Sequence, residues 1–204
     1  SDAYTNNNLT GDPDTAYRYA RGMPVIHPYH KARVQIGTPL DFLVVSDHAE
    51  FLGQIRNIHL NGVDTSNLGF IEKIKAWAAG YVLNRAIEGG AGHDFFVRVL
   101  PDPELSPLQD AEVSSIEDSD VSLLPMPQQV ETDAWRSITN TADKYNQPGE
   151  FTALIGWEWS SLPGGANLHR VVITDSDAAT AQQYAPFGLD DSPHPEDLWD
   201  WLDN

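Results

Sequence analysis

The stretch Leu-Asp-Phe-Leu-Val-Val-Ser-Asp-His-Ala-Glu-Phe-Leu-Gly at residues 40–53 is the part of the chain most informative about its fold. Its apolar residues 42–45 are enough for one buried strand, because strands of parallel sheets are continuous apolar runs. The run stops at Ser46, Asp47 and His48, with Glu50 two residues further on. Polar groups after such a strand lie where α/β folds bind ligands. The stretch therefore predicts an α/β fold with a site at this strand end.

Two later apolar runs also have an ionisable residue beside them. Residues 151–156 are followed by Glu158, and residues 168–174 begin with Leu168 and His169. Between these runs, Pro163-Gly164-Gly165 is a turn sequence, which predicts a hairpin. The hairpin would bring Glu158 and His169 close together.

Asp47, His48, Glu158 and His169 are therefore candidate metal ligands. Carboxylate oxygens and imidazole nitrogens are the donors that zinc, iron and manganese accept. Each residue also has an ordinary structural explanation: Asp47 as a helix cap, Glu158 as an ion-pair partner, and His169 as a strand residue bonded to backbone. Their shared position near three strand ends favours the metal site.

The motifs resemble those of a known superfamily. Val-Val-Ser-Asp-His at 44–48 looks like the second motif of the polymerase and histidinol phosphatase (PHP) superfamily. Gly156-Trp-Glu158, followed by a strand with His169, is similar to its third motif. Three longer segments, 11–22, 39–53 and 156–170, resemble a bacterial branch, domain-of-unknown-function family 3604.

This resemblance implies a distorted (β/α) barrel with two or three divalent metal ions, such as zinc, manganese or iron, at the carboxyl ends of its strands. It implies metal-dependent hydrolysis of a small phosphorylated substrate. Carried over to this sequence, Asp47 and His48 would be ligands, Glu158 would bridge two ions, and His169 would complete one of them.

The resemblance also implies that the barrel is incomplete. The superfamily's first motif, a His-x-His pair, precedes a segment like Ser1-Asp-Ala-Tyr4, and its last ligands would lie beyond Asn204. We therefore expect residues 1–204 to be a single PHP-like domain truncated at both ends. Weak or absent metal binding and no appreciable turnover are expected for these residues alone. Exposed sheet edges and apolar faces predict a homodimer.

Composition limits the alternatives. The 204 residues are 41% hydrophobic, which suits one globular domain, and they contain no cysteine, so any metal must be held by His, Asp, Glu or water. With 30 acidic and 12 basic residues the net charge is −18, which disfavours nucleic acid and anionic membranes as partners. The sequence leaves a cytoplasmic, periplasmic or secreted location open.

The most basic part of the chain contains His30, Lys31 and Arg33, which are candidate phosphate contacts. Further along, the pattern predicts helices at 12–22, 68–89 and 131–146 and one beginning near His194. The aromatic residues of 68–89 are expected in the core. Residues 101–130, rich in proline and acids, predict a long surface connection or insertion.

Two other functions remain open from the sequence. A metal-independent glycoside hydrolase would use Glu158 and Asp47 as its carboxylate pair, with Trp157 and Trp159 stacked on sugar rings. A non-catalytic metal- or ligand-binding module would use the same acids without turnover.

Overall fold

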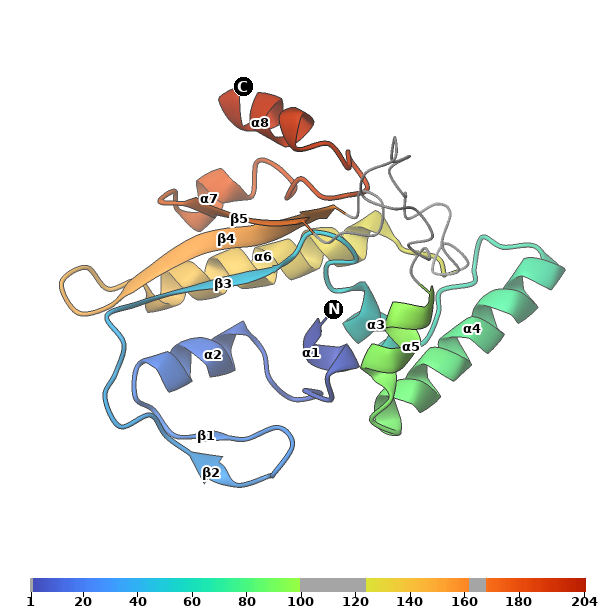
Figure 1. Cartoon of the computed structure of the whole chain (residues 1–204), viewed down its shortest axis with the longest axis horizontal. Coiled ribbons are helices and arrows are strands. Elements are labelled where there is room, and N and C mark those ends of the chain that lie inside the picture. The colour runs from blue at the N-terminus through green and yellow to red at the C-terminus, as the bar shows by residue number, and fades with distance from the viewer. Residues whose placement is uncertain (1, 100–123, 162–167) are drawn as a thin grey trace, which may run out of the picture.

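The computed structural model describes residues 2–99, 124–161 and 168–204, which form a mixed α/β domain (Figure 1). Its elements are, in chain order, α1 (Asp2–Thr5), α2 (Pro13–Ala20), β1 (Val25–Ile26), β2 (Arg33–Val34), β3 (Phe42–His48), α3 (Gln54–Asn61), α4 (Phe70–Glu88), α5 (Gly92–Val99), α6 (Gln128–Tyr145), β4 (Thr152–Ser161), β5 (Leu168–Thr174), α7 (Ala178–Ala181) and α8 (Pro195–Asp203). None of the helices in these described ranges is long and apolar enough to cross a membrane.

The main sheet has the strand order β3-β4-β5. β3 pairs with β4 in parallel, and β4 pairs with β5 antiparallel, as the predicted hairpin requires. The predicted turn, Pro163-Gly164-Gly165, lies outside the described residues. A separate two-stranded sheet joins β1 and β2. Within the described residues the strands form these two small sheets and no closed barrel. The α/β class is therefore confirmed, but the barrel is not.

The predicted helices are present, with boundaries set by local sequence. Asp12 caps α2 by accepting a 2.8 Å hydrogen bond from the Thr15 N–H, and Pro13 occupies the first turn. α4, α6 and α8 correspond to the three later helices. The predicted connection at 101–130 falls mostly on residues 100–123, outside the described residues, and its last three residues, 128–130, are already helical in α6.

One face of the main sheet is covered by helices. On β4, the side chains of Ala153, Ile155 and Trp157 are buried on this covered face. α6 packs against it, with the Trp135 ring edge-on to Trp157 at 5.8 Å between ring centroids. The C-terminal segment packs there too, since the Trp157 indole donates to the Phe187 carbonyl oxygen at 3.2 Å. These contacts fix β4 and leave its alternate residues on the opposite face.

That opposite face is partly open to solvent. Phe42, Val171 and Ile173 lie on it with 64%, 52% and 50% of their surface exposed. Its middle is formed at Gly156, the cross-strand partner of Ser46 and Ile173. We refer to it as the open face, and it carries the site described below.

A Gly156→Ala substitution is expected to lower the free energy of unfolding by about 2 kcal/mol, because overpacking costs typically 1–3 kcal/mol. A Cβ atom at this position would lie 2.7 Å from the Val172 carbonyl oxygen and 2.8 Å from a methyl group of Val44. Urea denaturation monitored by circular dichroism measures the change. Gly37→Ala is the matched control, since a Cβ there meets nothing within 4 Å. Equal stabilities of the two variants would contradict the packing of the open face.

A second core joins the helices at the other end of the domain. It contains Tyr4, Ile55, Ile58, Leu83 and Ile87, contributed by α1, α3 and α4. These side chains hold α4 against α3, and α4 lies at the right-hand edge of the molecule in Figure 1.

The aromatic residues of α4 are outside this core, so the expectation that they are buried is wrong. Phe70, Trp77 and Tyr81 are 80%, 66% and 56% exposed. The reason is that α4 is apolar on two sides. Ala76 and Gly80 are both small and buried, and a Cβ atom at Gly80 would lie within 4 Å of Ile58 on α3, so α3 packs closely here and the large side chains remain on the outside.

Candidate metal centre

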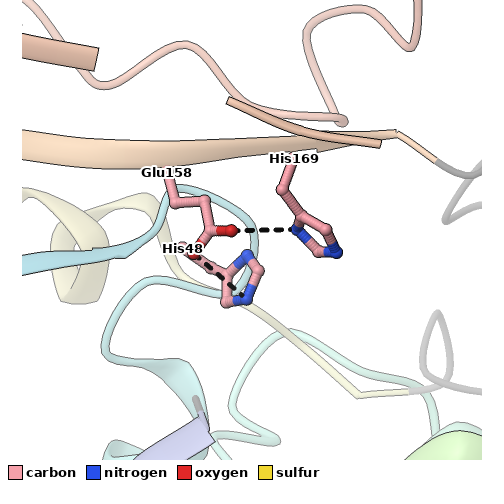
Figure 2. Close-up of side chains that lie close together, drawn as sticks. All are labelled: His48, Glu158 and His169. Carbon is pink, nitrogen blue, oxygen red and sulfur yellow. Dashed lines mark ion pairs between the residues drawn. The ribbon is translucent and has the colours of Figure 1, made fainter. Parts of the chain in front are cut away.

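Three ionisable side chains from three neighbouring strands meet on the open face. His48 on β3 is the direct cross-strand partner of Glu158 on β4, and His169 on β5 is the partner of Ser160, two residues beyond Glu158. His48 Nε2 lies 3.7 Å from Glu158 Oε2, and His169 Nδ1 lies 2.9 Å from Glu158 Oε1. Figure 2 shows both imidazole rings beside the Glu158 carboxylate. The strand register therefore builds the group without any contribution from loop conformation.

The group fits a divalent metal ion in its chemistry and spacing. One ligand atom from each of the three residues lies within 4.8 Å of the other two. Ligand atoms about 2.1 Å from a zinc ion at the tetrahedral angle are about 3.4 Å apart, so small side-chain movements would close these three on one ion. The His48, Glu158 and His169 side chains are 19%, 22% and 43% exposed, which leaves the group accessible from solvent.

Ser160 connects the two histidines. Its Oγ lies 2.9 Å from Nδ1 of His48 and 2.9 Å from Nδ1 of His169. A hydroxyl group has one proton and two lone pairs, so it can donate to one ring and accept from the other. Ser160 therefore links the protonation states of the two imidazoles.

Glu50 lies behind His48 and is 5% exposed. Its Oε1 accepts hydrogen bonds from the Ser160 and Leu189 N–H groups, both at 2.9 Å. Its Oε2 has no hydrogen-bond partner among the described residues and lies 3.4 Å from His48 Nδ1. A carboxylate beside one ring nitrogen favours the proton on that nitrogen, which leaves the Nε2 lone pair for a metal.

Glu50 is one of three acidic residues whose charges act on Asp190. The pKa of Asp190 is raised to about 6, first because its surroundings desolvate the carboxyl group and also because Asp191, Glu131 and Glu50 add negative charge. The carboxylates of Glu50 and Glu158 beside His48 favour a cation at the group.

The structure does not bring Asp47 to this group. Asp47 is paired with Trp157, whereas His48 is paired with Glu158, and successive strand residues point to opposite faces. The Asp47 side chain lines a cavity of about 840 Å³ between β3, α2, α3 and α6. The apolar run ends at Val45, which predicts Asp47 after the strand, but β3 continues through His48, and the alternation of side chains separates the two residues.

The basic candidates also lie elsewhere. His30, Lys31 and Arg33 are exposed and belong to the segment containing β1 and β2. Lys31 and Arg33 line a small pocket with Arg18 of α2. Figure 1 shows this segment on the other side of α2 from β4 and β5. Their proposed contact with a phosphate group stays a prediction.

Glu50 and Ser160 are the residues of the site to which sequence reasoning assigned no role. Glu50 stands two residues after His48 in the opening motif, which was the available signal. Its burial depends on Ser160 and Leu189, which are 110 and 139 residues away in sequence.

The family comparison agrees with the motifs. The model of the family DUF3604, described as a protein of unknown function, matches residues 1–204. The chain belongs to this family. Searches of curated proteins and of solved structures found no match. The expected membership of family 3604 is thus confirmed over the whole chain, while the wider PHP relationship remains an inference from the motifs.

Proposed function

We propose that this DUF3604 domain is the metal-binding part of a metal-dependent phosphoester hydrolase of the PHP type. The observation that supports it best is the His48–Glu158–His169 group on the open face, with donor atoms within 4.8 Å of one another. Imidazole and carboxylate donors suit zinc, manganese or iron. The motif resemblance adds the expectation of two or three ions in the intact protein.

Each residue then has a defined task. His48 and His169 supply neutral nitrogen donors, and Glu158 supplies the anionic oxygen. Glu50 orients the His48 imidazole through its Nδ1 atom, and the Ser160 hydroxyl contacts both rings. The chemistry supplied by a bound divalent ion is activation of water near neutral pH and neutralisation of charge on phosphoryl oxygens.

The net charge of the chain is compatible with a phosphorylated substrate only if a cation is bound. At a net charge of −18 the domain repels an anionic phosphate ester at long range. A metal at the group would provide the local positive charge that a small phosphorylated substrate requires. The same repulsion acts against nucleic acid and anionic membranes as partners.

The features that favoured a glycoside hydrolase in the sequence are not present in the structure. Trp157 and Trp159 are 2% and 0% exposed, so the predicted stacking of sugar rings on them is wrong. Asp47 and Glu158 occupy opposite faces of the sheet and cannot flank one glycosidic bond. A non-catalytic metal-binding module would need only the His48–Glu158–His169 group. It would bind the metal ion but hydrolyse no substrate.

Two measurements test the hydrolase. Isothermal titration of the metal-free chain with zinc and manganese is expected to show one ion bound per chain, with a dissociation constant in the micromolar range or weaker. Sub-micromolar affinity would contradict the expected incomplete site. Hydrolysis of phosphate mono- and diesters is then measured on the longest natural chain that contains these residues. Chelation is expected to abolish it. Metal binding without hydrolysis of any ester would favour the binding module, and no metal binding by the longest natural chain would reject both functions.

A further inference from the structure

The outer side of α4 carries a continuous exposed apolar stripe. Phe70, Ile74, Trp77 and Tyr81 are 80%, 53%, 66% and 56% exposed, and we call these four residues the outer stripe. They follow one another at intervals of four, three and four residues. This is the spacing of the apolar seam along which two helices pack.

A second stripe with the same spacing lies on the inner side of α4. Ala76, Gly80, Leu83 and Ile87 repeat the same intervals and are buried against the rest of the domain. A helix that is apolar on both sides is normally covered on both sides. The described part of the chain covers only the inner side of α4.

We propose that the outer stripe is a self-association surface, on which α4 of a second copy packs antiparallel about a two-fold axis. This inference is independent of the proposed hydrolase. Closed two-fold pairing uses the same patch on both copies, so a single self-complementary stripe is sufficient. The centre of the stripe, between Ile74 and Trp77, would lie at the axis, so that Phe70 of one copy faces Tyr81 of the other.

Charge favours a second copy at this position. The chain has 30 acidic and 12 basic residues, which makes most approaches between two copies repulsive. α4 instead contains Glu72 and Glu88 against Lys73, Lys75 and Arg85, a formal charge of +1. The acidic excess of the chain is therefore absent from this helix.

The stripe also has a suitable surface. Trp77 and Tyr81 are stacked, with centroids 5.8 Å apart and ring planes 17° apart, so they present a preformed aromatic surface. With about 200 Å² of surface for each large aromatic side chain, the exposed parts of Phe70, Trp77 and Tyr81 provide about 400 Å² per copy. A standard interface buries about 800 Å² per partner. The three aromatic residues supply about half of this, and Ile71, Ile74 and Val82 add to it.

Sedimentation velocity over a range of concentrations tests the proposal. We expect a dimer of the unmodified chain, and we expect Trp77→Glu to raise its dissociation constant by a factor on the order of 1,000, because a central aromatic anchor is lost twice in a two-fold dimer. Trp199→Glu on α8 is the matched control, since Trp199 is also exposed, at 53%. It is expected to leave the dimer unchanged. Circular dichroism checks that both variants are folded.

A cross-linking experiment tests the antiparallel geometry separately. The chain contains no cysteine, so single cysteines can be introduced without side reactions. Ile74→Cys lies near the axis and is expected to form a disulfide between copies. Phe70→Cys is not, because the two residues would be about 16 Å apart along the helices at 1.5 Å per residue. Cross-linking of both variants would indicate parallel helices.

Three results would overturn the proposal. They are a monomer at every concentration, equal loss of the dimer in Trp77→Glu and Trp199→Glu, or binding of the monomer to zwitterionic lipid vesicles through Trp77. The last result would assign the outer stripe to a lipid surface instead of a second copy.

Discussion

Glu158→Gln is expected to lower the affinity of the chain for zinc and manganese by more than about 100-fold. Mutation of residues that only support the ligands already lowers metal affinity by about 10–100-fold, and Glu158 would be a ligand itself. Glu158 is the one carboxylate of the metal group, and both histidines lie beside it. An amide of the same shape removes the negative charge and most of the donor strength. Isothermal titration of the metal-free chain measures the loss.

Asp47→Asn is the matched control for this experiment. It removes the carboxylate of the residue next to His48, which is paired with Trp157 and faces the other side of the sheet. Metal affinity is expected to be unchanged, and urea denaturation should show both variants folded. If Asp47→Asn reduced binding as much as Glu158→Gln, Asp47 would be a ligand after all, and the face assigned to it would be incorrect.

Two substitutions of Glu50 distinguish its contribution to folding from its contribution to metal binding. Glu50→Ala is expected to destabilise the domain by about 3 kcal/mol, because each buried N–H group left without an acceptor costs about 1–3 kcal/mol. The two groups concerned are the Ser160 and Leu189 N–H groups. Urea denaturation of the metal-free protein measures this loss.

Glu50→Gln should keep the fold and weaken the metal site. The two N–H donors require an acceptor, so the glutamine carbonyl takes the place of Oε1 and its NH₂ group faces His48 Nδ1. An NH₂ group donates, which moves the His48 proton to Nε2, the nitrogen that faces Glu158. We expect metal affinity to fall by about 10–100-fold.

Nitrogen chemical shifts of His48 report this change of tautomer directly, and titration reports the affinity. Unchanged shifts with unchanged affinity would show that Glu50 serves the fold alone. A loss of stability equal to that of Glu50→Ala would mean that the glutamine carbonyl does not replace the carboxylate oxygen.

Much of the fold could be predicted because the strands of the main sheet contain continuous apolar runs and α2 begins at a capping residue, Asp12. The hairpin that joins Glu158 to His169 is local, so a turn sequence was sufficient to predict their proximity. The end of β3 was harder to predict. Its apolar run stops at Val45, but pairing with β4 extends the strand through His48. Three polar residues were therefore strand residues, and alternation decided which of them faced the site.

The remaining features depend on contacts between distant parts of the chain. Glu50 is buried only because β4 and the segment at Leu189 supply N–H donors beside it. In α4, the spacing of apolar residues predicted the helix but did not predict which of its sides would be buried against the domain. The covered side is the one that contains Gly80, because the missing side chain leaves room for Ile58 of α3.

The parallel pairing of β3 with β4 also has a consequence for the order in which the domain folds. His169 and Ser160 are 9 residues apart in sequence, whereas His48 and Ser160 are 112 residues apart. Closing the longer loop costs more chain entropy and is slower, so β4 and β5 can associate before β3 joins them. Metal binding that requires His48 would then occur late in folding. Its rate would report when β3 has paired with β4.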